Sequence, residues 1–148
     1  MKVLYVGFKG ANNASRQLVE KVNSSNKLFL TNSYDGIKSN LDKVDLKSYE
    51  LILIFGINKN LKNKIVIEVK SKCDNEELMT TVNYKKFKLW LHENNIDVDI
   101  NFKPTRYLCN YAYYLALSKN TKGVFVHIPG LSKFPDLEKL VTIIGAYN

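Results

Sequence analysis

The amino-acid sequence predicts a single-domain, three-layer α/β/α sandwich, residues 1–148, built around a mostly parallel, mixed and twisted sheet. Near-continuous apolar runs at residues 2–8, 51–55 and 123–128 are typical of strands that are covered on both faces. Segments with apolar residues at helical spacing alternate with these strands, as they do in α/β domains. A chain of 148 residues with 45% hydrophobic content is large enough to bury one core of its own.

In the first half of the chain, strand-like and helix-like segments alternate. Ser15 is a suitable N-cap for a helix that carries apolar residues at helical spacing. The run at residues 51–55 is the clearest buried strand, and we expect it to end at Gly56 and to lie in the centre of the sheet. The predicted elements are a strand at residues 2–8, a helix at 15–22, a strand at 27–31, a weak helix at 37–44 and a strand at 51–55.

In the second half, the β-branched run at residues 65–69 predicts a strand that carries one carboxylate, Glu68. Residues 74–81 have no clear pattern. Because Pro104 follows a strand-like segment, the next helix should begin around Thr105 or Arg106. The predicted elements are strands at residues 65–69, 98–102 and 123–128, and helices at 84–94, from 105 or 106 onward, and at 137–144.

The net charge of +8 is compatible with a basic module that binds nucleic acid. Only Arg16 and Arg106 among the 22 basic residues are arginine, however, whereas bidentate phosphate contacts favour arginine. Because the lysines are dispersed along the chain, a solvated surface explains the charge better, and nucleic acid is not the expected partner. The apolar stretch at residues 3–8 is too short for a signal sequence or a membrane span, so we expect a cytoplasmic protein with no membrane partner.

The two cysteines, Cys73 and Cys109, form no CxxC pair, and neither has a histidine at metal-ligand spacing. We therefore expect reduced thiols rather than a disulfide framework or a zinc site. Cys109 lies near the start of a predicted helix and His127 near the end of a predicted strand, so the two could form a nucleophile and its base. A helix N-terminus or a neighbouring imidazolium lowers the pKa of a thiol, which predicts a populated thiolate at Cys109.

In open α/β sheets, functional residues gather outside the carboxyl ends of the strands. The turns at residues 8–13 and 56–60 fall there, as do Cys109 and His127, so these segments could share one cleft. A catalytic triad also needs a group that holds the imidazole in one tautomer and stabilises its charged form. Glu68 is the candidate for that role, although its place in a strand leaves the direction of its side chain open.

Two segments carry a specific pattern, Arg-Tyr-Leu-Cys-Asn at residues 106–110 and Phe-Val-His-Ile-Pro at residues 125–129. They resemble the signature of the pyroglutamyl peptidase I family, also called the pyrrolidone-carboxylate peptidases. Gly-Phe at residues 7–8 and Asn-Ala-Ser at residues 13–15 are similar to the family's opening Gly-Phe and Asn-Pro-Ser. Ile-Glu-Val at residues 67–69 resembles the segment that presents the family's glutamate. The segments that contain Glu68, Cys109 and His127 follow one another in the same order as in the family.

The resemblance implies a phosphorylase/hydrolase-like α/β fold and a cysteine peptidase that removes an amino-terminal pyroglutamyl residue from peptides. Cys109 would attack the acyl carbonyl, His127 would relay the proton to the leaving amine, and Glu68 would orient His127. Backbone N–H groups at the start of the Cys109 helix would stabilise the oxyanion. The partner would be a peptide with a blocked amino terminus, and neither a metal nor a cofactor would take part.

Phe8 would form an apolar wall for the pyrrolidone ring, and Asn13 and Ile57 lie in the segments expected to contact substrate. The chain departs from the family at residues 9–11 and 57–59, so a divergent member with the triad but another small acyl or lactam substrate is one alternative. The other is a non-catalytic basic binding module. A homo-oligomer also stays open, because the tyrosines at residues 111–114 suit either a core or a subunit contact.

Overall fold

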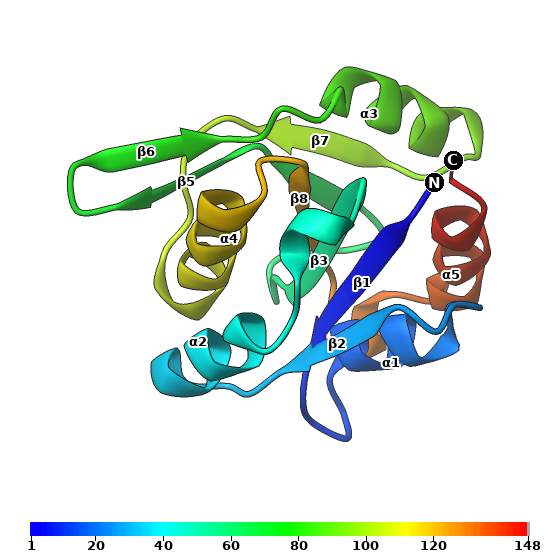
Figure 1. Ribbon diagram of the computed structural model, residues 1–148. Coiled ribbons are helices and arrows are strands. Elements are labelled where there is room, and N and C mark those ends of the chain that lie inside the picture. The colour runs from blue at the N-terminus through cyan, green and yellow to red at the C-terminus, as the bar shows by residue number, and fades with distance from the viewer. Residues whose placement is uncertain (148) are drawn as a thin grey trace.

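The computed structural model of the protein describes residues 1–147. Its strands are β1 (Val3–Phe8), β2 (Lys27–Leu30), β3 (Leu51–Ile57), β4 (Ile65–Glu68), β5 (Lys70–Cys73), β6 (Glu76–Met79), β7 (Val98–Asn101) and β8 (Gly123–Ile128). One sheet has the order β2-β1-β3-β8-β4-β7, and β5 and β6 form a separate antiparallel hairpin (Figure 1). Strands β2, β1, β3 and β8 run parallel, whereas β4 is antiparallel to β8 and parallel to β7. The predicted mixed, mostly parallel sheet is confirmed.

Helices cover both faces of this sheet, which confirms the three-layer sandwich (Figure 1). Helices α1, α3 and α5 pack on one face, and α2 and α4 pack on the other, where the β5–β6 hairpin lies beside α4. The helices are α1 (Ala14–Lys21), α2 (Tyr34–Asp42), α3 (Tyr84–Glu93), α4 (Tyr107–Lys119) and α5 (Leu137–Ala146), with short 3-10 turns at Leu46–Ser48 and Leu131–Lys133.

The central strands are buried along nearly their whole length because they receive helices on both sides. In β3, Ile52 and Ile54 pack beneath α2 and α4, whereas Leu53 and Phe55 pack on the opposite face. Each such side chain contributes roughly 1.5–3 kcal/mol when it is fully buried. Strand β3 lies inside the sheet, as predicted, and its alternating side chains pack in two separate cores, one on each face.

The N-cap of α1 differs from the prediction. Asn13 caps the helix, because its Oδ1 accepts hydrogen bonds from the backbone N–H groups of Ser15 and Arg16 at 2.9 and 3.2 Å. Ser15 is fully buried inside the helix, and its hydroxyl accepts from the Phe8 N–H at 3.0 Å and donates to Asn13 Oδ1 at 2.6 Å. The predicted cap was wrong because Ser15 is instead used to fix the end of β1 against α1.

Two further elements differ from the prediction. Strand β3 does not end at Gly56 but continues to Ile57, because both residues pair with β8. The unassigned stretch at residues 74–81 contains most of a hairpin, in which Asp74 takes a left-handed conformation with φ of 52°. Asp and Asn tolerate this conformation in tight turns, so Asp74-Asn75 was the local signal for the hairpin.

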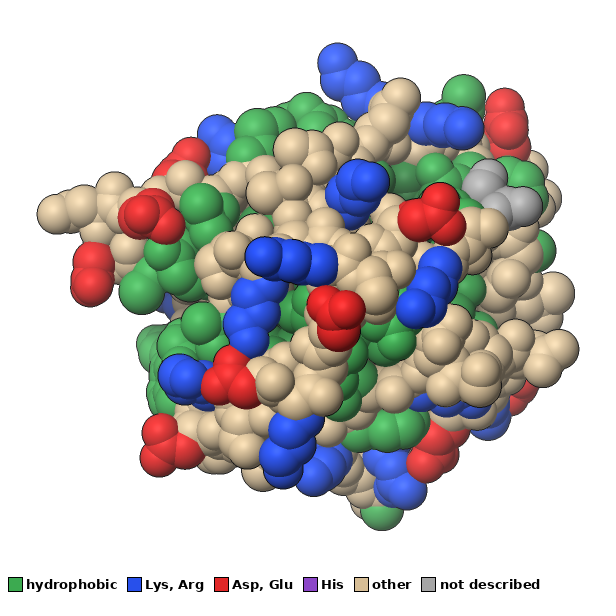
Figure 2. All heavy atoms as spheres, in the orientation of Figure 1, with side chains coloured by type: hydrophobic (Ala, Val, Ile, Leu, Met, Phe, Trp, Pro, Cys, Tyr) green, Lys and Arg blue, Asp and Glu red, His purple; other side chains and the backbone are tan. Residues whose placement is uncertain are grey.

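Lysine and arginine side chains are interspersed with acidic and neutral groups on the face that Figure 2 shows. Several of them pair with carboxylates, as Lys38 and Lys119 do with Asp42. Exposed ion pairs of this kind contribute little to stability. Within residues 1–147, no helix is long and apolar enough to cross a membrane.

Candidate active site

A buried histidine–glutamate pair lies on the α4 face of the sheet. His127 is in β8 and Glu68 ends β4, and in this antiparallel pair Glu68 lies opposite Phe125, two residues before His127. Both side chains therefore point to the same face, where His127 Nδ1 and Glu68 Oε1 are 2.9 Å apart and the side chains are only 8% and 5% exposed. The direction of Glu68, which the sequence left open, is toward His127.

The partner of Nδ1 decides the tautomer of His127. An ionised carboxylate only accepts hydrogen bonds, so Nδ1 carries the proton that Glu68 Oε1 accepts. In the neutral ring this leaves Nε2 without a proton and free to act as a base. The second oxygen of Glu68 is also held, because Asn101 Nδ2 donates to Oε2 at 2.7 Å.

Cys109 is brought to the same face by α4, of which it is the third residue. Its Sγ lies 3.1 Å from the position that a Cβ would take on Gly56. Gly56 is the direct neighbour of His127 in the parallel pair of β3 and β8, and neighbouring strands lie about 4.8 Å apart. The thiol therefore stands over the strand next to His127, on the face that holds the Glu68–His127 pair.

The start of α4 supplies unpaired backbone donors beside the thiol. Arg106 is extended and does not cap the helix with its side chain, and Tyr107 takes a left-handed conformation with φ of 63°. This conformation costs roughly 1–2 kcal/mol in a residue other than glycine, and it turns the chain sharply into the helix. The N–H groups of the first helical turn have no acceptor within the helix, so they are available to an anionic oxygen near Cys109.

The resting state of the thiol differs from the prediction made from the sequence. Burial, and secondarily the negative charge of Glu68, raise the pKa of Cys109 to about 11. Burial is the larger of these two effects, because Cys109 packs against the apolar cluster beneath α4. At neutral pH Cys109 therefore carries a neutral thiol.

The alkylation rate of Cys109 should report this raised pKa. In a Cys73→Ser background, we expect the rate with iodoacetamide to be low at pH 7 and to keep rising beyond pH 9, because the thiolate fraction grows until the pH passes about 11. Mass spectrometry of the Cys109 peptide over a pH series measures the rate. A plateau already reached at pH 7 would contradict this, since it would indicate a thiolate stabilised by the His127 imidazolium.

Phe8 reaches the same face as the thiol. Val6 pairs with Ile54, so the residues two positions further on, Phe8 and Gly56, also share a face of the sheet. Phe8 is only 4% exposed and packs in the cluster beneath α2 and α4. It is thus placed as a wall on the far side of Gly56 from His127, although little of its ring is open.

Asn13 and Ile57 are placed differently. The side-chain oxygen of Asn13 is occupied with the cap of α1. Ile57 packs against the cluster on the opposite face of the sheet, because side chains alternate after Gly56. The structure thus brings Cys109, His127 and Glu68 to one face, and it does not bring the Ile57 side chain to them.

The close approach of Cys109 to the sheet requires glycine at position 56. A Cβ there would lie 2.6 Å from Phe125 Cζ and 3.1 Å from Cys109 Sγ. We expect Gly56→Ala to lower the free energy of unfolding by roughly 1–3 kcal/mol, as overpacked cores do, when measured by urea denaturation. Gly145→Ala is the matched control, because its nearest atom would be at 3.7 Å and alanine favours a helix. Equal stability of both variants would contradict the tight packing.

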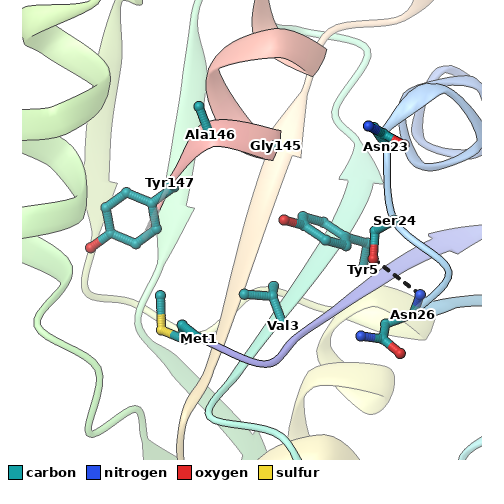
Figure 3. A pocket seen from close by; sticks show the side chains of 9 residues that line it. All are labelled: Met1, Val3, Tyr5, Asn23, Ser24, Asn26, Gly145, Ala146 and Tyr147. Carbon is teal, nitrogen blue, oxygen red and sulfur yellow. Dashed lines mark hydrogen bonds between the residues drawn. The ribbon is translucent and has the colours of Figure 1, made fainter.

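Other parts of the structure lack this chemistry. Among residues 1–147, no group of three or more His, Cys, Asp or Glu side chains could hold a metal ion. A polar hollow of about 360 Å³ lies near the start of β1 and the end of α5, lined among others by Tyr5, Ser24 and Asn26 (Figure 3). It contains neither cysteine nor histidine and sits at the end of β1 opposite to Phe8.

The arrangement is thus an α/β sandwich with a buried His–Glu pair and a thiol on one face of a mixed sheet. Solved structures similar to this fold include pyrrolidone carboxyl peptidases. The enzyme from Thermus thermophilus has a TM-score of 0.82 at 17% identity, covering 97% of this chain and 96% of its own. Pyroglutamyl peptidase I of Bacillus amyloliquefaciens has a TM-score of 0.80 at 15% identity, covering 98% and 94%.

The pyrrolidone carboxyl peptidase of Thermococcus litoralis has a TM-score of 0.73 at 19% identity, with 98% of this chain and 90% of its own covered. No protein-family model and no curated protein sequence matches the chain. At such low identity the likeness establishes the fold, which covers nearly the whole of both chains.

Proposed function

We propose that this protein is a cysteine peptidase that removes an amino-terminal pyroglutamyl residue from peptides, with Cys109 as nucleophile, His127 as general base and Glu68 as the group that orients His127. The observation that carries the proposal is the buried 2.9 Å contact of His127 Nδ1 with Glu68 Oε1, one strand away from the Cys109 thiol. The fold shared with pyrrolidone carboxyl peptidases supports the substrate class.

The mechanism follows from the resting state of the three groups. Because the thiol is protonated, His127 Nε2 takes its proton as Sγ attacks the acyl carbon. The oxyanion is stabilised by backbone N–H groups of the first turn of α4, each worth roughly 3–4 kcal/mol in other enzymes. Collapse of the tetrahedral intermediate expels the peptide amine, which takes the proton from His127. Water then hydrolyses the thioester, releases pyroglutamate and restores the thiol.

Glu68 acts throughout on the charge and orientation of the ring. Its carboxylate keeps the proton on Nδ1, so that Nε2 is the basic nitrogen, and it stabilises the imidazolium that forms during the attack. Burial of the pair on the α4 face strengthens this interaction, because little water competes for either partner.

A second candidate retains the triad but acts on another small acyl or lactam substrate. It is favoured by the near-complete burial of Phe8 and by the placement of the Ile57 side chain on the opposite face, since both leave the ring-binding wall less developed. The catalytic groups do not depend on these two residues.

One assay separates the two candidates. Purified protein is tested on a fluorogenic amide of pyroglutamate and on matched amides of proline, glutamine and acetylated glycine. Selective hydrolysis of the pyroglutamyl amide supports the first proposal, and hydrolysis of another amide without it supports the second. Failure on all of them, together with salt-sensitive binding to RNA or DNA, would favour the basic binding module.

A further inference from the structure

We propose that Asn101 is a positioning residue that fixes Glu68 for its work on His127; the proposal rests on the function proposed above. Asn101 is the last residue of β7, the edge strand of the sheet, and pairs directly with Glu68 in the neighbouring strand β4. Its side chain reaches Glu68 Oε2, the carboxylate oxygen that does not contact His127.

The hydrogen bonds around Asn101 determine the orientation of its side-chain amide. Nδ2 faces two acceptors, Glu68 Oε2 at 2.7 Å and the Lys103 carbonyl oxygen at 2.9 Å. Oδ1 faces one donor, the Lys103 N–H at 3.1 Å. The opposite assignment would place an NH2 group against an N–H and an oxygen against two oxygens, so only one orientation satisfies the network.

The geometry gives Asn101 two roles at once. Glu68 is held at both oxygens, by His127 from β8 and by Asn101 from β7, so its carboxylate cannot rotate away from the ring. Hydrogen bonds to a charged group are among the stronger ones in proteins. Through Lys103, the same amide fixes the loop at residues 102–106, which leads into the helix of Cys109. The Asn101 side chain therefore connects the Glu68–His127 pair with the loop that leads to Cys109.

Two substitutions separate positioning of Glu68 from simple support of the loop. Asn101→Asp retains the acceptor for the Lys103 N–H but replaces the donor that faces Glu68 Oε2 and the Lys103 carbonyl oxygen with a carboxylate oxygen. Asn101→Leu removes both functions at similar volume. We expect either substitution to lower kcat for a pyroglutamyl amide roughly 10- to 100-fold with little change in KM, as loss of comparable outer partners does elsewhere. If Asn101 only supported the loop, Asn101→Asp, which keeps the bond from the Lys103 N–H, would retain clearly more activity than Asn101→Leu.

Asn120 offers a matched control. Its Oδ1 also accepts from the N–H two residues on, at 3.0 Å from Lys122, and its Nδ2 donates to two carbonyl oxygens, those of Leu46 and Tyr49. It makes none of these bonds to the Glu68–His127 pair. Asn120→Asp should therefore leave kcat unchanged, whatever it does to thermal stability.

A readout without substrate makes this test independent of the proposed activity. In 15N-labelled protein, the proton on His127 Nδ1 reports its hydrogen bond to Glu68. We expect its NMR resonance to shift or broaden in both Asn101 variants and to stay in place in Asn120→Asp, with cooperative thermal unfolding as the check of folding. An unchanged resonance in folded Asn101→Asp overturns the inference. If wild-type protein hydrolyses no pyroglutamyl amide, the proposed function fails, while the resonance still decides the role of Asn101.

Discussion

Cys109→Ala is expected to abolish hydrolysis of pyroglutamyl amides, with a fall in kcat/KM of about 10⁴-fold or more, as loss of a catalytic nucleophile causes elsewhere. The reason is that His127 and Glu68 can activate water only poorly without a sulfur atom above Gly56. The substitution removes one partly buried atom that makes no hydrogen bond needed by the fold, so the protein should remain folded. Steady-state kinetics on a fluorogenic pyroglutamyl amide measures the effect.

Cys73→Ala provides the control for this result. Cys73 is also a free cysteine of intermediate exposure, but it lies in strand β5 of the hairpin, outside the six-stranded sheet that carries His127. We expect kcat/KM within about twofold of wild type, since surface changes away from the site rarely matter. Retention of activity in Cys109→Ala, or its loss in Cys73→Ala, would show that the nucleophile has been misassigned.

Glu68→Gln is expected to lower kcat roughly 10³- to 10⁴-fold, the size of the loss when the corresponding carboxylate of another triad becomes an amide. The structure gives the reason. Glu68 accepts a hydrogen bond at each oxygen, from His127 Nδ1 and from Asn101 Nδ2. A glutamine has only one oxygen, so its NH2 group must face one of these two donors, and the buried imidazolium loses its counter-charge. KM should change little, because Glu68 does not contact substrate in the mechanism proposed.

The stability of Glu68→Gln should fall as well, by roughly 1–3 kcal/mol, because one buried donor is left unpaired. Glu77→Gln is the matched control. Glu77 forms a 3.3 Å ion pair with Lys70 in the hairpin, is 45% exposed, and should tolerate the change in both kcat and urea denaturation. Near-normal kcat in Glu68→Gln would reduce the site to a Cys109–His127 dyad.

The fold could be predicted because its central strands are covered on both faces. The apolar runs in β1, β3 and β8 show this directly, and the helices between them follow from their periodicity. The strand order could not be predicted, because it depends on where β4 inserts and on its reversal relative to β8. The β5–β6 hairpin was missed because its strands are polar and short, so that only the turn at Asp74 marked it.

The sequence indicated which residues form the candidate site, but it did not indicate how these residues are placed relative to one another. Cys109, His127 and Glu68 could be nominated from local context and resemblance. The contact between His127 and Glu68 depends on the antiparallel register that sets Glu68 opposite Phe125, which no local pattern encodes. The sequence predicted a lowered pKa for the Cys109 thiol, whereas burial raises it. Burial depends on tertiary packing, which the local sequence does not show. Asn101 was missed for the same reason, because its partner Glu68 is 33 residues away.

In the proposed mechanism, Cys109 forms a covalent acyl intermediate with the pyroglutamyl group. The direct measurement is rapid acid quenching of the protein during turnover of a pyroglutamyl amide, followed by mass spectrometry of the Cys109 peptide. The proposed mechanism predicts one pyroglutamyl group on Cys109, none on Cys73, and none after prior alkylation of Cys109. Hydrolysis that continues at the wild-type rate after Cys109 has been alkylated would contradict it.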